Sequence, residues 1–523
     1  MRHVQMNKLL TGLVSLFTLC QVGVLQAQTP RLVLLITVEE LRSDLLEELS
    51  KEMPHDGVNR LLSKGRVYSK VQSPLLSADA TASEAIIHTG ALASASGISE
   101  RQPTLKERSG RRVPTNSIFQ DKNYLGYATS GNYSPLALTS PTLGDNLKSA
   151  YGSKSLVYSI APRAEEAIIG AGVYGDAAYW IDGYSARWAS STYYSREFPW
   201  YIDKTNSGTS SLPTRLSSGI TWQPLSTQSR IPTTSSFNHS FRKTTSDITD
   251  FKDSPLVNDE VVSLARKLFE STQLGKDETP DLLSLHLTVG NANKAAQGLS
   301  RETIESYFRL DRTIASLLQL VDAKSTLIIL TGNGMSREYP PTDIDDRRLF
   351  KPDRCLALVN MYLHAEYGVQ GLVEEITPTG AVYLNRETIK SNPKLHLKEI
   401  QSAVSDFLLE FSGISYAIEE HRLRDQAIAN SDNATWLTAL NSATNANRPD
   451  VVFGLLPSWT AQDLSTERGV AKYRMTATPT TTVIMYPSVE AEKIDTPLDL
   501  REVSTKIAWI LRIRPPTPRS ILR

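Results

Sequence analysis

The sequence predicts an α/β fold, with a doubly wound, mainly parallel sheet flanked by helices. Three apolar runs support this prediction, at Leu32 to Val38, Pro280 to Val289 and Ser325 to Thr331. Such runs are typical of strands that are buried on both faces of a sheet. Apolar residues have helical spacing at Leu256 to Phe269, before the second run, and at Thr303 to Val321, before the third run. Helices and strands are therefore expected to alternate.

The composition is that of a globular protein with no charge bias. A length of 523 residues allows roughly two to four domains. Lys plus Arg equals Asp plus Glu, at 56 each, so the net charge is zero. This balance removes the simplest argument for nucleic acid or an anionic membrane as a partner.

The N-terminus has the pattern of a secretory signal peptide. Arg2 and Lys8 precede an apolar run that ends in Gln-Ala-Gln, which predicts cleavage after Ala27 and a mature chain without a transmembrane segment. The residues before Cys20 match a lipoprotein signal poorly, and its lipidation stays open. Without residues 1–27 only Cys355 remains, so the mature chain can form no intrachain disulfide.

The first apolar run ends at two carboxylates, Glu39 and Glu40. Ligands of open α/β sheets bind at the carboxyl ends of the strands, where an acid can hold a divalent metal. The alternative is that Glu39 only stabilises the positive end of the following helix.

Further elements follow in order. Gly57 to Gly65 predicts a short helix and Val67 to Val71 a strand, and a second helix ends at Thr89-Gly90 with Ser77 or Asp79 as its N-cap. The stretch from about 203 to 250 is rich in Ser, Thr and Pro, which predicts an irregular insert. After Lys351 the pattern changes to strands and helices of another spacing: Ala381 to Leu384, Leu397 to Phe411, Thr435 to Leu440 and Val451 to Leu456.

Several motifs resemble one enzyme family. An acid after the first strand, a Thr at the start of a helix that ends in Thr89-Gly90, and then Gly97-Ile98 resemble the alkaline phosphatase superfamily. Others resemble its PafA-type, phosphate-irrepressible phosphomonoesterases: Thr142 to Leu147, Ala177 to Asp182, Trp188 to Tyr194, Asn360 to Leu363, Ala381 to Asn385, Arg448 to Val452 and Leu456 to Trp459. These matches run in order from about Arg31 to about Pro487.

The resemblance implies an architecture. It implies an alkaline phosphatase-like core at 28–350, an α+β accessory lobe at 351–470, and a return to the core sheet at 471–523 with a strand at Thr480 to Tyr486.

The resemblance also implies two zinc ions, held at the strand ends by carboxylates and imidazoles, and a metal-bound Thr as nucleophile. This sequence departs from that pattern at most positions. The metal-site and nucleophile positions become Glu39, Ala80, Asn291, Ala295, Asn333 and Gly334, and the helical His that follows the nucleophile becomes Glu84. Thr81 lies one residue from the nucleophile position. The final metal-binding histidine has no candidate, because the last histidine of the chain is His421.

The phosphate-binding positions also change. The Lys-x-Arg pair of the family falls on Arg163 and Glu165, and its Asn falls near Arg101. An acid at Glu165 would repel a phosphate dianion. Side chains that could form a rebuilt metal site are His88, His286, Glu84, Glu39 and Asp79. For His88 and Glu84 the alternative is a solvated pair on a helix face, and for His286 it is a hydrogen-bonded core histidine.

Three functions remain open. The first is a catalytically silent binding or scaffolding subunit without a cofactor, exported to the periplasm or to a face of the outer membrane, whose partner is another cell-envelope protein. The second is an active phosphatase or phosphodiesterase with a rearranged zinc site that uses Thr81. The third is a glycan or small-molecule binder whose aromatic groups either stack on the ligand or pack in the core: Tyr179-Trp180, Trp188, Tyr193-Tyr194 and Trp200-Tyr201.

Overall fold

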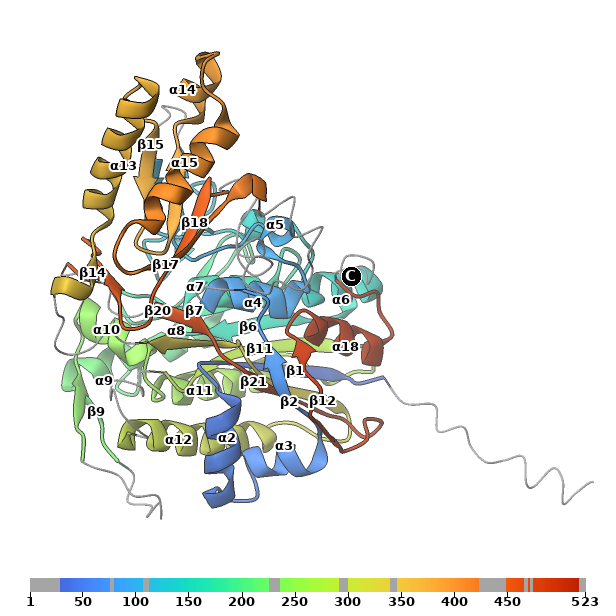
Figure 1. Cartoon of the computed structure of the whole chain (residues 1–523). Coiled ribbons are helices and arrows are strands. Elements are labelled where there is room, and N and C mark those ends of the chain that lie inside the picture. The colour runs from blue at the N-terminus through green and yellow to red at the C-terminus, as the bar shows by residue number, and fades with distance from the viewer. Residues whose placement is uncertain are drawn as a thin grey trace, which may run out of the picture.

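The computed structural model describes residues 29–75, 80–106, 112–224, 236–290, 300–338, 346–422, 448–464, 469–470 and 474–516. Within these ranges no helix has the length and apolar character needed to cross a membrane. Figure 1 shows a large central sheet with helices on both faces and a smaller lobe stacked above it.

The central sheet is mainly parallel. Its order is β22-β2-β21-β12-β1-β11-β6-β7-β8-β5, and β23 also pairs with β2. The strands are β1 (Leu32–Glu39), β2 (Arg66–Gln72), β5 (Gly126–Tyr127), β6 (Val157–Ala161), β7 (Ala177–Ile181), β8 (Trp188–Ser191), β11 (Asp281–Thr288), β12 (Thr326–Gly332), β21 (Thr480–Met485), β22 (Lys493–Ile494) and β23 (Leu498–Asp499). The central strand β1 pairs in parallel with β11 and β12, which confirms the predicted α/β fold with three adjacent apolar strands.

Helices cover both faces of this sheet (Figure 1). One layer contains α2 (Ser43–Leu49), α3 (Val58–Lys64), α11 (Val257–Ser271) and α12 (Arg301–Leu318), and the other contains α4 (Ala80–Thr89), α6 (Leu143–Tyr151), α7 (Ala164–Ala171) and α18 (Glu502–Leu511). Alternate side chains of β1 point to opposite faces. Leu34 and Ile36 pack toward the first layer, and Val33 and Leu35 pack toward the second. The predicted caps Ser77 and Asp79 of α4 lie outside the described residues.

The stretch predicted to be an irregular insert is largely ordered in its described part. It contains α8 (Trp200–Asn206), α9 (Leu212–Ser218), β9 (Ile220–Trp222), β10 (His239–Phe241) and α10 (Thr245–Lys252). Trp222, Phe241 and Phe251 are buried in the core beneath the sheet. These few aromatic residues anchor a segment whose polar composition hides its structure, so the prediction of an irregular insert was wrong here.

The smaller lobe has its own four-stranded sheet, of order β15-β16-β18-β17. Its elements are α13 (Pro352–Tyr367), β15 (Val373–Ile376), β16 (Ala381–Leu384), α14 (Arg386–Ser391), α15 (Leu397–Leu409), β17 (Ile414–Glu419) and β18 (Val451–Leu455). A separate cluster of buried residues forms its core. The helix expected at Thr435 to Leu440 lies outside the described residues.

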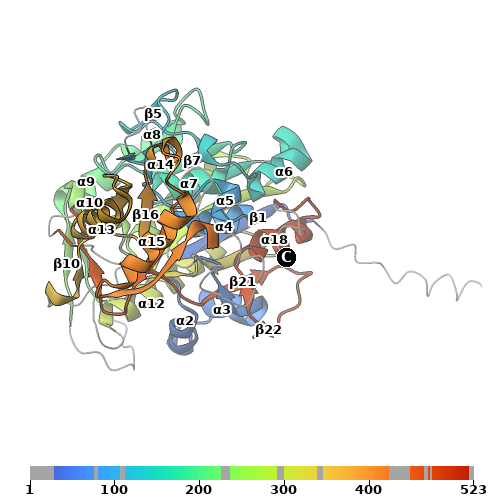
Figure 2. The ribbon, with the colours of Figure 1, turned by 45° about the horizontal axis from the view of Figure 1, so that its top comes forward.

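Short strands tie the lobe to the core. In the sheet pair β13 (Met335–Glu338) and β20 (Arg474–Ala477), the chain leaves the core at β13 and comes back toward it at β20. The hairpin β3 (Thr104–Lys106) and β4 (Arg112–Pro114) reaches the lobe through Arg112. The Arg112 guanidinium lies 2.6 Å from the Glu375 carboxylate and 3.4 Å above the Tyr383 ring. Figure 2 shows the lobe extending over the helices α4 and α7.

A candidate active site in which guanidinium groups meet the strand-end carboxylates

The parallel register of the three central strands brings their polar ends to one edge. Glu39, the last residue of β1, is level with Thr288 of β11, and Val38 is level with Gly332 of β12. Asn333 follows Gly332, and its backbone N–H donates to the Val38 carbonyl at 3.2 Å. Glu39 and Asn333 therefore lie at the same sheet edge, whereas Asn291 and Ala295 lie outside the described residues.

Two guanidinium groups hold Glu39. Arg337 Nη2 donates to Glu39 Oε1 at 2.7 Å, and Arg163 Nη1 donates to Glu39 Oε2 at 3.3 Å. Both arginines also pair with Asp253, at 3.4 Å from Arg337 Nη1 and in a direct ion pair with Arg163. The side chain of Arg337 is 1% exposed. We call Glu39, Glu40, Asp253, Arg163 and Arg337 the ion-pair cluster.

Glu40 completes this cluster at a conformational cost. Its backbone has φ +65°, in the left-handed region that non-glycine residues adopt rarely. Its Oε1 lies 3.1 Å from Arg337 Nε, and the Arg337 backbone N–H donates to Oε2 at 3.3 Å. Backbone strain of roughly 1–3 kcal/mol persists only where surrounding contacts enforce it, and it is concentrated at functional sites.

The charges of the cluster set the protonation of its acids. Burial disfavours the ionised form of Glu39, but the charges of Arg337 and Arg163 hold its pKa well below the ordinary value. Burial and the neighbouring Glu39 charge raise the pKa of Glu40. Glu39 is thus an ionised carboxylate whose two oxygens both pair with cations.

A second buried chain of polar groups adjoins Glu39. Glu84 on α4 accepts from Thr37 Oγ1 at 2.9 Å and lies 3.1 Å from His88 Nε2 and 3.3 Å from His286 Nδ1. His286 Nε2 lies 3.8 Å from Glu39. Glu84 and His88 are both fully buried, so the solvated helix-face interpretation was wrong, whereas the interpretation of His286 as a hydrogen-bonded core histidine was right.

This chain holds His286 in its charged form. Although burial opposes protonation, the charge of Glu84, the hydrogen bond to Glu84 and the nearby Glu39 carboxylate raise the pKa of His286 to about 10. The reciprocal effect acts on Glu84: burial opposes its ionisation, but His286 and His88 lower its pKa to about 2. A protonated imidazole has no lone pair to offer a metal ion.

The start of α4 carries the nucleophile position. Ala80 begins the helix, and Thr81 beside it is fully buried, with Oγ1 donating to Glu166 Oε1 at 3.0 Å. Arg101 pairs with Glu166 at 2.8 Å and approaches Glu165 at 3.8 Å. Burial raises the pKa of Glu165, while the Arg101 charge lowers that of Glu166 against the effect of burial. The Arg101 guanidinium thus lies beside both acids and offsets part of their repulsion of an anion.

The remaining predicted positions are occupied by backbone and core contacts. Asn333 Oδ1 accepts from the Met335 N–H at 3.1 Å, so this amide braces the turn after β12. Gly334 has φ +69° within that turn. The aromatic groups are largely core packing, because Tyr179, Trp180 and Trp188 are buried, whereas Trp200 is 67% exposed.

The described residues do not fit a pair of zinc ions. Zinc needs free carboxylate or neutral imidazole ligands. Here both oxygens of Glu39 pair with guanidinium groups, and His286 lies between the carboxylates of Glu39 and Glu84. In the part of the chain that the structure describes, no group of three or more His, Cys, Asp and Glu side chains is placed to hold a metal ion.

Sequence reasoning missed Arg337 and Asp253. Arg337 carried only a weak signal, because it lies in β13, a few residues after the end of β12, and cations that follow parallel strands of one sheet can meet an acid at its edge. Asp253 carried none, since it caps the C-terminal end of α10 just beyond the stretch whose composition predicted irregular chain.

The comparisons with known proteins agree with this architecture. No protein-family profile matches the chain. A Myroides odoratus protein named calcium-transporting ATPase is 23% identical over 451 residues, which cover 81% of each chain. Alkaline phosphatase PafA of Elizabethkingia meningoseptica is 22% identical over 436 residues, covering 76% of this chain and 77% of that protein. Alkaline phosphatase PhoV of Synechococcus elongatus is 23% identical over 315 residues, or 56% of each chain.

The solved structures show the same fold. The crystal structure of wild-type alkaline phosphatase PafA matches with a TM-score of 0.72 and 18% identity, covering 93% of this chain and 96% of that one. Similarity in sequence and fold along most of both chains shows that this protein belongs to the alkaline phosphatase superfamily, in its PafA-type branch.

Proposed function

We propose that this protein is an exported alkaline phosphatase-like protein that has lost hydrolase activity and acts by binding, as a subunit or scaffold in the cell envelope. The observation that carries the proposal is the ion-pair cluster. Arg337 and Arg163 pair with both oxygens of the one carboxylate that survives at a metal-ligand position, Glu39. A cation that is part of the chain then neutralises the acids that a metal would neutralise.

The chemistry of guanidinium supports loss of hydrolysis. Two-metal phosphoryl transfer depends on ions that bind the nucleophile, lower its pKa and stabilise the leaving oxygen. A guanidinium group donates hydrogen bonds, but it has no vacant orbital to accept a nucleophile's lone pair. Binding zinc at Glu39 would require displacing both arginines, and each displaced guanidinium would need another buried partner.

A second candidate, an active phosphatase with a rearranged site, is favoured by one contact. Thr81 donates to Glu166, whose pKa is lowered, so an ionised carboxylate lies beside a hydroxyl that it could deprotonate. The relatives PafA, PhoV and PhoK are also named alkaline phosphatases. Against it, Thr81 is fully buried among paired charges.

One experiment separates the two candidates. The protein, purified without chelators, is assayed for zinc content and for turnover of p-nitrophenyl phosphate and its bis-ester, with and without added zinc. We expect less than one zinc per chain and no turnover above that of the Thr81→Ala variant. Two tightly held zinc ions, or turnover that Thr81→Ala abolishes, would overturn the proposal and establish the active-enzyme candidate.

Export rests on the N-terminal pattern that ends at Ala27. Intact-mass measurement of the protein from the cell envelope should give a chain that begins near Gln28. A retained N-terminus, or a lipid on Cys20, would contradict cleavage by a simple signal peptidase.

A further inference from the structure

The structure contains a cavity of about 510 Å³ that is separate from the candidate active site. It lies between the C-terminal end of α4, the short helix α5 (Ala93–Ser96), α6 and the segment after α18. Thr81 is near the first residue of α4, whereas Gly90 at the cavity follows its last residue. With a rise of about 1.5 Å per residue, the cavity and Thr81 are roughly 13 Å apart along the helix.

We propose that this cavity binds a small amphiphilic anion, with a carboxylate or sulfonate group on an apolar body. Its volume falls within the range of about 300–1,000 Å³ that is usual for small-molecule sites. The inference does not depend on whether the protein hydrolyses phosphate esters, because the cavity shares no residue with the ion-pair cluster.

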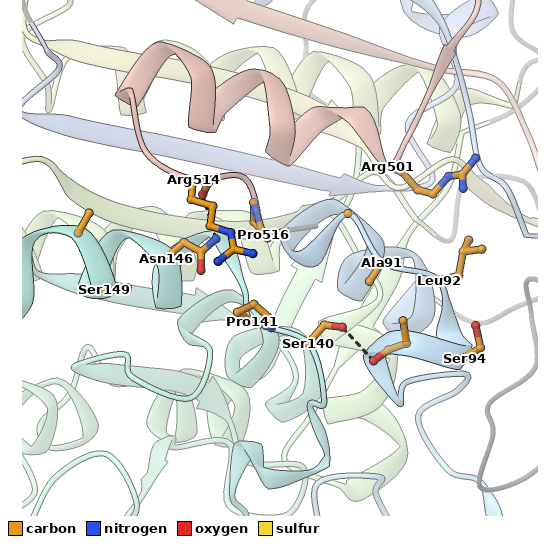
Figure 3. Close-up of a pocket in the computed structure, with 13 residues that line it drawn as sticks. Ala91, Leu92, Ser94, Ser140, Pro141, Asn146, Ser149, Arg501, Arg514 and Pro516 are labelled. Carbon is orange, nitrogen blue, oxygen red and sulfur yellow. Dashed lines mark hydrogen bonds between the residues drawn. The ribbon is translucent and has the colours of Figure 1, made fainter. Parts of the chain in front are cut away.

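The charge of the cavity comes from Arg514. Figure 3 shows its side chain at one end, near Asn146 and Pro141, while Arg501 lies at the other end beside Leu92. Asp499 neutralises Arg501, through contacts of 3.0 and 2.7 Å. Among the described residues, by contrast, no carboxylate pairs with Arg514. Within the described part of the chain, the cavity therefore offers one guanidinium group without a carboxylate partner, and guanidinium is the preferred partner of carboxylate and related oxyanions.

The backbone of the segment that carries Arg514 is held against α6, while the Arg514 side chain is exposed. Asn146 on α6 donates from Nδ2 to the Arg514 carbonyl at 2.9 Å, which anchors the segment after α18 against α6. Ser140 donates to the Ala95 carbonyl at 2.9 Å and so holds the opposite wall against α5. Two walls that are hydrogen-bonded to their neighbours form a site that needs little rearrangement on binding.

The rest of the lining determines the body of the ligand. Seven of the thirteen lining residues are apolar: Gly90, Ala91, Leu92, Ala95, Pro141, Ala150 and Pro516. The others are Ser94, Ser140, Asn146, Ser149 and the two arginines, and Ser140 and Asn146 already donate to backbone carbonyls. The apolar walls leave room for a flat or branched hydrocarbon body. One cation at one end of an apolar space thus favours an amphiphilic anion over a polyol or a multiply charged phosphate.

The test uses two dyes of nearly the same shape. 8-Anilinonaphthalene-1-sulfonate carries one negative charge, and N-phenyl-1-naphthylamine is the same body without it. Fluorescence titration of the full-length protein should show saturable binding of about one sulfonate dye per chain, at least 10-fold tighter than the neutral dye. A charge-assisted hydrogen bond contributes about 1.5–3 kcal/mol, which corresponds to about 10-fold or more in Kd.

Three variants locate the binding. Arg514→Gln should remove the preference for the charged dye. Ala150→Trp places a large side chain at an exposed position of α6 on the cavity wall, so it should weaken the binding of both dyes by 10-fold or more. Arg512→Gln is the matched control, because Arg512 is an exposed cation on the same segment that does not line the cavity. A cooperative urea transition identical to that of the wild type verifies folding in each case.

Two outcomes would overturn the proposal. One is that the preference for the charged dye does not depend specifically on Arg514: it is undiminished in Arg514→Gln, or Arg512→Gln loses as much of it. Either result would place the dye elsewhere. The other is binding that appears only when the chain is shortened to end at Pro516, which would mean that the following residues, not a ligand, occupy the cavity.

Discussion

Replacement of Arg337 by Met should be strongly destabilising if the ion-pair cluster is built as described. Arg337 is 1% exposed and pairs with Glu39, Glu40 and Asp253. Methionine fills much of the same volume without the charge. Removing one partner of a buried ion pair costs about 3–5 kcal/mol, because the remaining charges stay buried without compensation. We expect a loss of this size in the free energy of unfolding in urea at pH 7.

The exposed pair of Arg42 and Asp44 provides the matched control. These side chains lie 2.6 Å apart, and 34% and 60% of their surfaces are exposed. Arg42→Met should therefore cost less than about 1 kcal/mol. Adding Glu40→Gln to Arg337→Met should recover part of the loss, since Arg337 is the cation that pairs with Glu40.

The dependence on pH gives a second test of the same variant. In the wild type the pKa of Glu39 is lowered below its ordinary 4.5, so its pairing stabilises the fold above that pH, and this stabilisation is lost as the pH falls. Without Arg337, burial of the ionised acids costs stability above pH 4.5. The difference between wild type and variant should therefore shrink as the pH falls from 7 toward 4. The reasoning is refuted if Arg337→Met costs no more than Arg42→Met, or if its cost is unchanged at pH 4.

Three further predictions concern the neighbouring groups. The pKa of His286 is raised to about 10, so the pairing of its charged form stabilises the fold fully below the ordinary pKa of 6.5, and this stabilisation is lost as the pH rises toward 10. The free energy of unfolding in urea should fall over this pH range in the wild type, and His286→Gln should flatten that fall. Gly334→His restores one family ligand, but metal analysis of this variant should find no retained zinc, because Arg337 and Arg163 still hold Glu39. Gly334→Ala is its control, since it measures the loss of stability caused by any side chain at φ +69°. Arg112→Ala removes the contacts to Glu375 and Tyr383, so it should lower the free energy of unfolding by about 1–2 kcal/mol and speed amide hydrogen exchange in β15 and β16. Unchanged exchange would mean that other contacts hold the lobe.

The sequence predicted the central sheet well because burial on both faces leaves a clear signal. The runs of β1, β11 and β12 are continuous and apolar, and their polar ends mark the sheet edge at Glu39 and Asn333. The ordered segment around Trp222 escaped prediction for the opposite reason. Its helices and strands are short, so tertiary contacts of a few aromatic residues, not local pattern, determine its structure.

The altered ligand positions stay a prediction from the resemblance, and the charged groups that surround Glu39 were not foreseen. Family positions could be checked one at a time, so the missing ligands at Ala80, Asn333 and Gly334 were visible in the sequence. The groups that compensate them, Arg337 and Asp253, follow different elements and meet only in the folded chain. Contacts between residues this far apart in sequence leave no local pattern.

If the metals are lost as we propose, the cluster explains how the fold tolerates their absence. In a site built around two divalent ions, clustered carboxylates repel one another once the ions are absent, and each buried charge is costly. Here asparagine at position 333 removes one charge, and two arginines on neighbouring segments supply opposite charge to Glu39, Glu40 and Asp253. The strained backbone of Glu40 is then a consequence of directing a second acid at Arg337. Under this reasoning the arginines and the altered ligands are coupled, so the return of catalysis would require several simultaneous changes, each of which alone leaves a buried charge unpaired.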